Sequence, residues 1–134
     1  AIAGVLAMHP EVLVLDEPTA GLDPKGRDEI LDEISTLHTE RHMTIVLVSH
    51  SMEDIARYAD RIIVMNHGEK MFDAPPKEVF RHYKELEAMG LAAPQITYIV
   101  QGLKEHGVPI ADDITTVAEA KDAILHLLGK DKRS

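Results

Sequence analysis

Three short apolar runs constrain the fold of this chain more than any other feature of its sequence. They are rich in β-branched residues, and continuous runs of this kind are typical of strands buried on both faces of a sheet. Helical patterns separate them, and such alternation is typical of parallel α/β layers. We therefore expect residues 1–83 to form part of an α/β domain. The predicted strands are Val12–Leu15, Thr44–Ser49 and Arg61–Met65.

Local signals predict where several helices and one turn begin. Asp23 is expected to be the N-cap of a long helix, with Pro24 as its first residue. Ser51 and Asp54 resemble a capping box and predict a second, shorter helix. Asn66-His-Gly68 is typical of a turn, which would join the third strand to a fourth at residues 69–73 as a hairpin.

From about residue 84 the pattern becomes wholly helical. Pro94 is expected to start one helix, and Thr116 with Glu119 fits a capping box at the start of another. Short helices in isolation are marginal in water, so their apolar stripes must be buried against something. We therefore expect residues 84–134 to form a small helical extension. Its stripes are Ile96, Ile99, Val100 and Leu103, and then Val117, Ala120, Ile124, Leu127 and Leu128.

Composition excludes several classes of protein. The 134 residues carry 14 Lys+Arg and 23 Asp+Glu, and this net charge of −9 argues against a general nucleic-acid binder. The absence of cysteine excludes disulfides and thiolate-bound metals. The longest uncharged stretch, Ala88–Leu103, is too short and too polar to span a bilayer. The chain opens inside an apolar run with Ala1 rather than Met, so we expect it to be cut from a longer protein.

Two adjacent acids, Asp16 and Glu17, follow the first predicted strand. In open α/β folds, ligands bind at the carboxyl ends of the strands. One carboxylate there would hold Mg²⁺, usually through water, and the other would accept a proton from an attacking water. A solvated strand end explains the bare pair equally well, so this pattern alone leaves both interpretations open.

The surrounding sequence favours the first interpretation. Leu15–Pro24 closely resembles the Walker B and D-loop motifs of ATP-binding cassette (ABC) ATPases, and Ile45–His50 resembles their switch-histidine strand. The resemblance implies that Asp16 binds Mg²⁺ and that Glu17 is the general base for the hydrolytic water. It also implies that His50 contacts the γ-phosphate of ATP, and that Asp23 faces the phosphate-binding loop of a partner ATPase.

Two motifs of that family are missing. The sequence contains no G-x-x-x-x-G-K-[ST] phosphate loop and no Leu-Ser-Gly-Gly-Gln signature. The resemblance therefore implies the carboxyl-terminal part of a P-loop, RecA-like ABC ATPase domain followed by a helical extension. It also implies that the phosphate-loop strand lies between the strands at 44–49 and 61–65, which leaves an incomplete sheet. We expect the chain alone neither to bind ATP tightly nor to hydrolyse it.

Residues after the predicted hairpin, including the helical extension at residues 84–134 (the tail), make the resemblance to ABC ATPases more specific. Ala74–Phe80 resembles the turn and helix that follow the hairpin in many transporter ATPases, and Met89–Thr97 resembles energy-coupling-factor ATPases, including the cobalt-type CbiO proteins. This implies an ATPase with ATP and Mg²⁺ as cofactors, at the cytoplasmic face of the cell membrane, powering uptake of a vitamin or a transition-metal ion such as cobalt. The implied partners are a second ATPase subunit, identical or paralogous, a transmembrane coupling subunit and a membrane substrate-binding subunit. The tail would form part of the contact between the ATPase subunits.

Two other classes of function stay open at this point. A soluble ABC ATPase of DNA repair or chromosome maintenance would share these motifs, although the chain shows neither a basic face nor a long coiled coil. A non-catalytic assembly module would act through the helical tail alone. His38 and His42 are spaced to clamp a metal ion on one helix, but no third ligand is evident and a solvated face is favoured.

Overall fold

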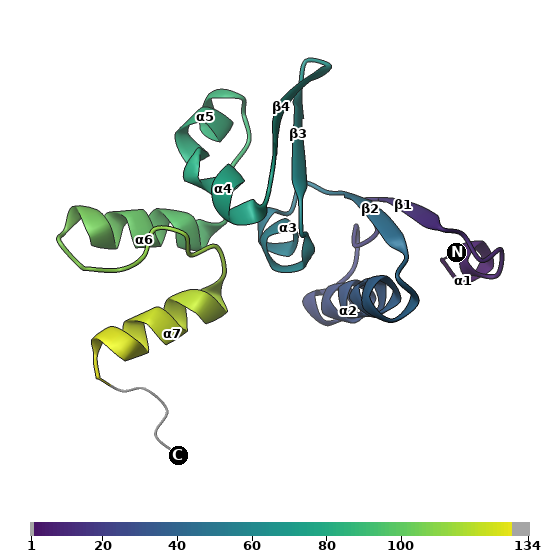
Figure 1. The fold of residues 1–134 in the computed structure, drawn as a ribbon, viewed down its shortest axis with the longest axis horizontal. Coiled ribbons are helices and arrows are strands. Elements are labelled where there is room, and N and C mark those ends of the chain that lie inside the picture. The colour runs from purple at the N-terminus through teal and green to yellow at the C-terminus, as the bar shows by residue number, and fades with distance from the viewer. Residues whose placement is uncertain (1, 130–134) are drawn as a thin grey trace. The chain divides into compact units, whose positions relative to one another are not determined.

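The computed structural model describes residues 2–129 (Figure 1). The chain divides into two compact units, residues 1–50 and residues 51–134, which are described separately. The two units meet between residues 50 and 51. The domain boundary that the sequence pattern favours lies later, between residues 83 and 84, and stays a prediction. Among residues 2–129, no helix combines the length and the apolar character needed to cross a membrane.

The first unit is built around two parallel strands. β1 (Val12–Asp16) pairs with β2 (Thr44–Val48), with Val12 opposite Thr44 and Asp16 opposite Val48. The long helix α2 (Pro24–Arg41) connects the strands, as expected for a parallel crossover. A short helix α1 (Ile2–Leu6) precedes them. The buried hydrophobic side chains of this unit come from β1, from α2 and from the residue before β2: Leu13, Leu31, Ile34 and Met43.

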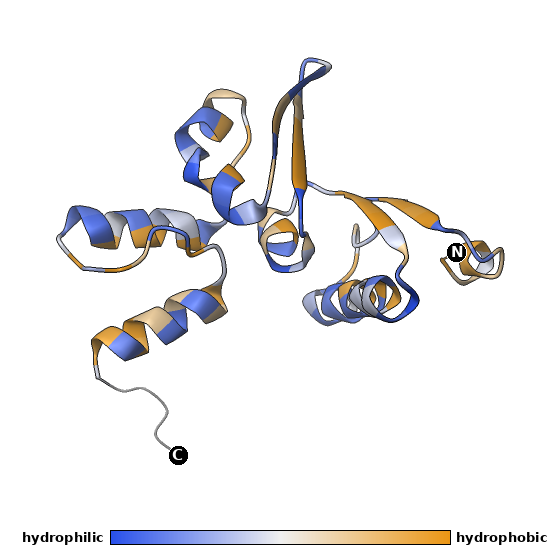
Figure 2. Ribbon diagram, viewed as in Figure 1, coloured by the Kyte–Doolittle hydropathy of each residue, from blue (hydrophilic) through white to orange (hydrophobic). Residues whose placement is uncertain are grey.

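The expectation that these strands are buried on both faces was wrong for this unit. Figure 2 shows β1 and β2 as continuous apolar ribbons, yet only Leu13 among their residues is buried. Successive side chains alternate between the faces of a strand, so one layer of structure covers only every second residue. The valines of the other face are exposed: Val12, Val14, Val46 and Val48.

The second unit begins with α3 (Met52–Tyr58) and an antiparallel hairpin of β3 (Ile62–Asn66) and β4 (Glu69–Ala74). His67 and Gly68 in the turn have φ of 48° and 80°, the left-handed pair that two-residue hairpin turns require. The hairpin is therefore confirmed. Ser51 is the N-cap of α3 as predicted, but its side chain makes no capping hydrogen bond.

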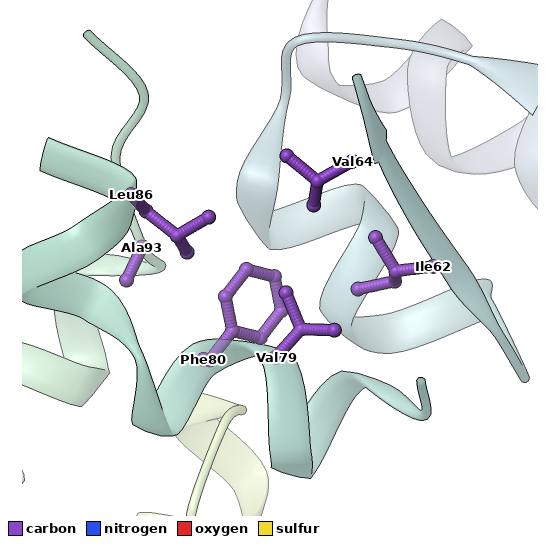
Figure 3. Close-up of a cluster of buried hydrophobic side chains, with 6 residues drawn as sticks. All are labelled: Ile62, Val64, Val79, Phe80, Leu86 and Ala93. Atoms are coloured by element: carbon purple, nitrogen blue, oxygen red, sulfur yellow. The ribbon is translucent and has the colours of Figure 1, made fainter. Parts of the chain in front are cut away.

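Two further short helices cover the hairpin, α4 (Pro76–Arg81) and α5 (Tyr83–Ala88). Figure 3 shows the resulting core, in which the ring of Phe80 lies among aliphatic side chains from the other elements. Phe80 and Val79 are almost completely buried. The buried members of this cluster are Ile62, Val64, Val79, Phe80, Leu86 and Ala93. β3 and β4 form a two-stranded sheet of their own.

The tail contains two helices, α6 (Gln95–Glu105) and α7 (Val117–Leu127), with a core of their own. The hydroxyl of Thr116 accepts a hydrogen bond from the Glu119 backbone N–H at 3.3 Å, which confirms the predicted cap of α7. The carboxylate of Glu53, on α3, accepts from the Gln95 backbone N–H at 3.2 Å and so caps α6 from outside the tail. The buried core residues are Val100, Ile110, Ile114 and Ala120.

Candidate functional site

The structure brings Glu17 and His50 together. Glu17 follows the last residue of β1 and His50 lies two residues beyond the end of β2. Glu17 Oε1 lies 2.7 Å from His50 Nδ1, a hydrogen bond between residues 33 positions apart in the chain. The parallel pairing of β1 with β2 puts the carboxyl ends of both strands at one edge of the sheet, where ligands of α/β proteins bind.

A backbone turn at Glu17 helps to set this geometry. Its φ is 47°, a left-handed conformation that is uncommon for a residue with a side chain. Its N–H donates to the carbonyl of Val48 at 2.8 Å, which adds one more bond to the ladder between β1 and β2. Ala20 N–H then donates to the Glu17 carbonyl at 3.1 Å, so the chain turns immediately after the strand. Glu17 is thereby tied to the strand that carries His50.

The Glu17–His50 pair is asymmetric in its exposure. The side chain of His50 is 87% exposed, whereas that of Glu17 is 32% exposed. An ionised carboxylate only accepts hydrogen bonds, so with Glu17 ionised the Nδ1–H of His50 donates to it. The carboxylate then orients the imidazole, and Nε2 makes no hydrogen bond within the described residues. This arrangement places a carboxylate that can accept a proton beside an imidazole that can hydrogen-bond a ligand.

Asp16 lies next to this pair, as the last residue of β1. It is exposed, and its carboxylate makes no hydrogen bond or ion pair within the described residues 2–129. Mg²⁺ keeps much of its water and is commonly held by one or two carboxylates together with substrate phosphates. A single free carboxylate at the carboxyl edge of the sheet fits that donor set.

Asp23 has a different environment. It is the N-cap of α2, and its Oδ1 accepts from the Gly26 backbone N–H at 3.1 Å. A Cβ at residue 26 would lie 2.9 Å from the same oxygen, so a larger residue there would require the Asp23 side chain to shift. Among the described residues, Asp23 makes no hydrogen bond or ion pair with Glu17 or His50. The capping function predicted from sequence is confirmed, and its D-loop function stays a prediction.

The two histidines considered for a metal clamp do not form one in the part of the chain that the structure describes. His38 Nδ1 is 2.9 Å from the carbonyl of Met43, and His42 ends α2 with a left-handed φ of 51°. Within residues 2–129, no group of three or more His, Asp or Glu side chains is placed to hold a metal ion. Both histidines lie near the carboxyl end of α2, where His38 contacts a backbone carbonyl and His42 is the C-cap residue.

Comparison with known proteins shows which proteins the chain resembles. No protein-family model matches the chain. The energy-coupling factor transporter ATP-binding protein EcfA2 of Clostridium tetani is 58% identical over 127 residues, which make up 95% of this chain and 44% of that protein. The EcfA2 proteins of Clostridium perfringens and Clostridium acetobutylicum are 56% and 55% identical, over 96% and 99% of this chain and 45% and 46% of their own lengths.

One solved structure has a similar fold. The structure of cbiO1 from Clostridium perfringens, described as part of the ABC transporter complex cbiONQ, superposes with a TM-score of 0.55 at 40% identity. The match covers 65% of this chain and 36% of that one. The predicted fold class is confirmed: the described residues have the α/β fold of the carboxyl-terminal part of an ABC ATPase domain, followed by helices. The chain spans less than half the length of the EcfA2 relatives, and over that length it is similar to the energy-coupling factor transporter ATP-binding proteins.

Proposed function

We propose that this chain is the carboxyl-terminal part of an ATP-hydrolysing subunit of an energy-coupling-factor ABC transporter. The full-length subunit would bind ATP and Mg²⁺ and power uptake of a vitamin or of a transition-metal ion such as cobalt. The observation that carries the proposal is the 2.7 Å bond between Glu17 and His50 at the carboxyl edge of a parallel sheet. The EcfA2 and cbiO1 likenesses support the transporter class.

Each site residue has a separate role in this proposal. Asp16 would hold Mg²⁺ through water, and the ion would supply positive charge to the phosphate oxygens when bound. Glu17 accepts the proton of the attacking water. His50, oriented by Glu17, hydrogen-bonds the γ-phosphate. Asp23 faces the phosphate-binding loop of the second ATPase subunit, from the start of α2.

The proposed assembly contains more than one protein. The subunit would lie peripherally on the cytoplasmic face of the cell membrane. It would bind a second ATPase subunit, identical or paralogous, a transmembrane coupling subunit and a membrane substrate-binding subunit, with no nucleic acid. Affinity purification of the full-length protein from its own cells tests this. We expect its membrane subunits to co-purify, whereas DNA-stimulated ATPase activity without membrane partners would contradict the transporter class.

The 134-residue chain by itself should neither bind ATP tightly nor hydrolyse it. The backbone amides and the lysine of a phosphate loop supply most of the affinity for phosphates in P-loop proteins, and this sequence has no such loop. Isothermal titration with Mg-ATP measures the affinity. Micromolar affinity of the chain alone for Mg-ATP would contradict this, because it would show that ATP binds tightly without a phosphate loop.

We also propose that the tail is part of the contact between the two ATPase subunits. One face of α7 packs on the tail core through Ala120, which is buried, and Ala123, which is half buried. The neighbouring face remains apolar and exposed, with Val117 at 71% and Leu128 at 63%. Val117, Ile124 and Leu128 follow one line along the helix, as helical spacing requires. A second ATPase subunit is the occupant that the proposed assembly provides for this stripe.

Truncating the full-length protein before Ala88 should therefore weaken its dimerisation in the absence of ATP. This truncation also removes Ala93 from the hairpin core, so a second variant is needed. Ile124→Lys with Leu128→Lys disrupts only exposed positions and should weaken the dimer as well, because buried charges oppose association. Asp122→Lys, on the opposite side of α7, is the matched control. Sedimentation equilibrium measures the affinities, and unchanged values in both tail variants would exclude the tail from the dimer contact.

A further inference from the structure

Lys77 links two parts of the second unit that are distant in sequence. It lies in the first turn of α4, and its Nζ donates to the Glu119 carboxylate at 2.8 Å and to the Asp113 carbonyl at 3.0 Å. The Asp113 carboxylate is also within 3.8 Å. Glu119 is in the first turn of α7, so this one ammonium connects α4 to the start of the last helix.

A second set of charges holds the same loop. The Asp112 carboxylate lies between Lys104 Nζ, at 3.0 Å, and the guanidinium of Arg81, at 3.5 Å. The hydrogen bond from Lys104, with the charge of Arg81 behind it, lowers the pKa of Asp112 below its usual value. We name the six groups that fasten this loop the polar clasp: Lys77, Arg81, Lys104, Asp112, Asp113 and Glu119.

The clasp matters because α7 has few other attachments. Ala120 is its only member of the buried tail core, and alanine contributes little apolar surface. Leu125 of α7 is partly buried, but Ile124 and Leu127 of this helix and the C-cap residue Leu128 are exposed. The hydrogen bond between Glu119 N–H and Thr116 is local to α7 and does not attach the helix to anything else. Buried Ile114 fixes the chain just before α7, and the ion pair of Lys77 with Glu119 adds an attachment on the helix itself.

We propose that Lys77 is the positioning residue that docks α7 so that its exposed apolar stripe is presented to the second ATPase subunit. This inference rests on the proposed role of the tail in the dimer contact. The clasp residues are all partly exposed, so their attraction is screened by salt. The affinity of the nucleotide-free dimer is consequently coupled to ionic strength through a contact that lies outside the interface.

Lys77→Met in the full-length protein tests this, because methionine keeps the apolar stem and removes the ammonium. Amide exchange in α7 should become about five- to tenfold faster, as expected for the loss of two surface charge contacts. The nucleotide-free dimer should weaken by a similar factor at about 50 mM salt, and the difference from wild type should shrink at about 500 mM salt. Lys77→Arg should restore most of the wild-type behaviour.

Lys84→Met is the matched control, since it removes an equal charge from α5 outside the clasp. If the α7 amides of the Lys77→Met variant exchange at the wild-type rate, the polar clasp does not hold α7 in place. Faster exchange with unchanged dimer affinity would overturn its link to the interface, provided that the Ile124→Lys, Leu128→Lys variant does weaken the dimer. If that surface variant has no effect, the proposed dimer contact itself fails. The two failures are thus distinguishable.

Discussion

Replacing Glu17 by Gln in the full-length protein should slow ATP hydrolysis by about 10²–10⁴-fold while ATP still binds. The amide keeps the shape of the side chain, and its oxygen can still accept the 2.7 Å hydrogen bond from His50. It cannot accept the proton of the attacking water, so only the chemical step is lost. Steady-state phosphate release gives the turnover rate, and equilibrium nucleotide titration gives the affinity.

Glu40→Gln, on an exposed position of α2, is the control for the same chemical change elsewhere in the unit. It should leave turnover at the wild-type level. Turnover near wild type in Glu17→Gln would remove Glu17 from the role of general base. A loss of ATP binding together with turnover would instead assign it to the nucleotide site.

The second large effect is expected for His50→Ala, which should reduce turnover by about 10²–10³-fold, the usual cost of losing one donor to a transition-state oxyanion. The structure adds a second reason. Within residues 2–129, His50 hydrogen-bonds the Glu17 carboxylate, so its removal should also free the proposed general base to rotate. Phosphate release measures this effect too.

His106→Ala is a suitable control for the histidine variant, because His106 is exposed and lies at the end of α6, where it bonds a backbone carbonyl. Thermal unfolding of both variants should be compared, since the exposed His50 ring contributes little packing. A His50→Ala protein that keeps its turnover within a few-fold of wild type would show that the switch-histidine assignment is wrong.

Local signals were sufficient for the elements whose ends are set by a few neighbouring residues. Asp23 caps α2, Pro24 begins it, and Thr116 caps α7, because a capping bond spans only three residues of chain. His67 and Gly68 form the hairpin turn for the same reason, since two left-handed residues are enough to reverse a strand. These features are encoded in single short windows of sequence.

The resemblance in turn located the candidate site residues but not their mutual geometry. Sequence placed Asp16 and Glu17 at one strand end and His50 at another. Neither segment by itself indicates that Glu17 and His50 form a hydrogen bond. That contact depends on the register of β1 against β2 and on the left-handed turn at Glu17. Register is a property of paired strands, and it is set only when both strands meet.

Burial and charge pairing depended still more on the tertiary structure. The valine face of β1 and β2 was expected to be buried, because a continuous apolar run does not reveal which layers cover it. Nothing in the local sequence indicates that Asp113 pairs with Lys77 or that Asp112 pairs with Lys104, because packing brings these distant residues together. By itself, then, the sequence determined the caps, the hairpin turn and the order of strands and helices, because each arises from interactions between near neighbours. Only the tertiary structure decided the Glu17–His50 contact, the exposed faces and the polar clasp, because these depend on how distant segments pack together.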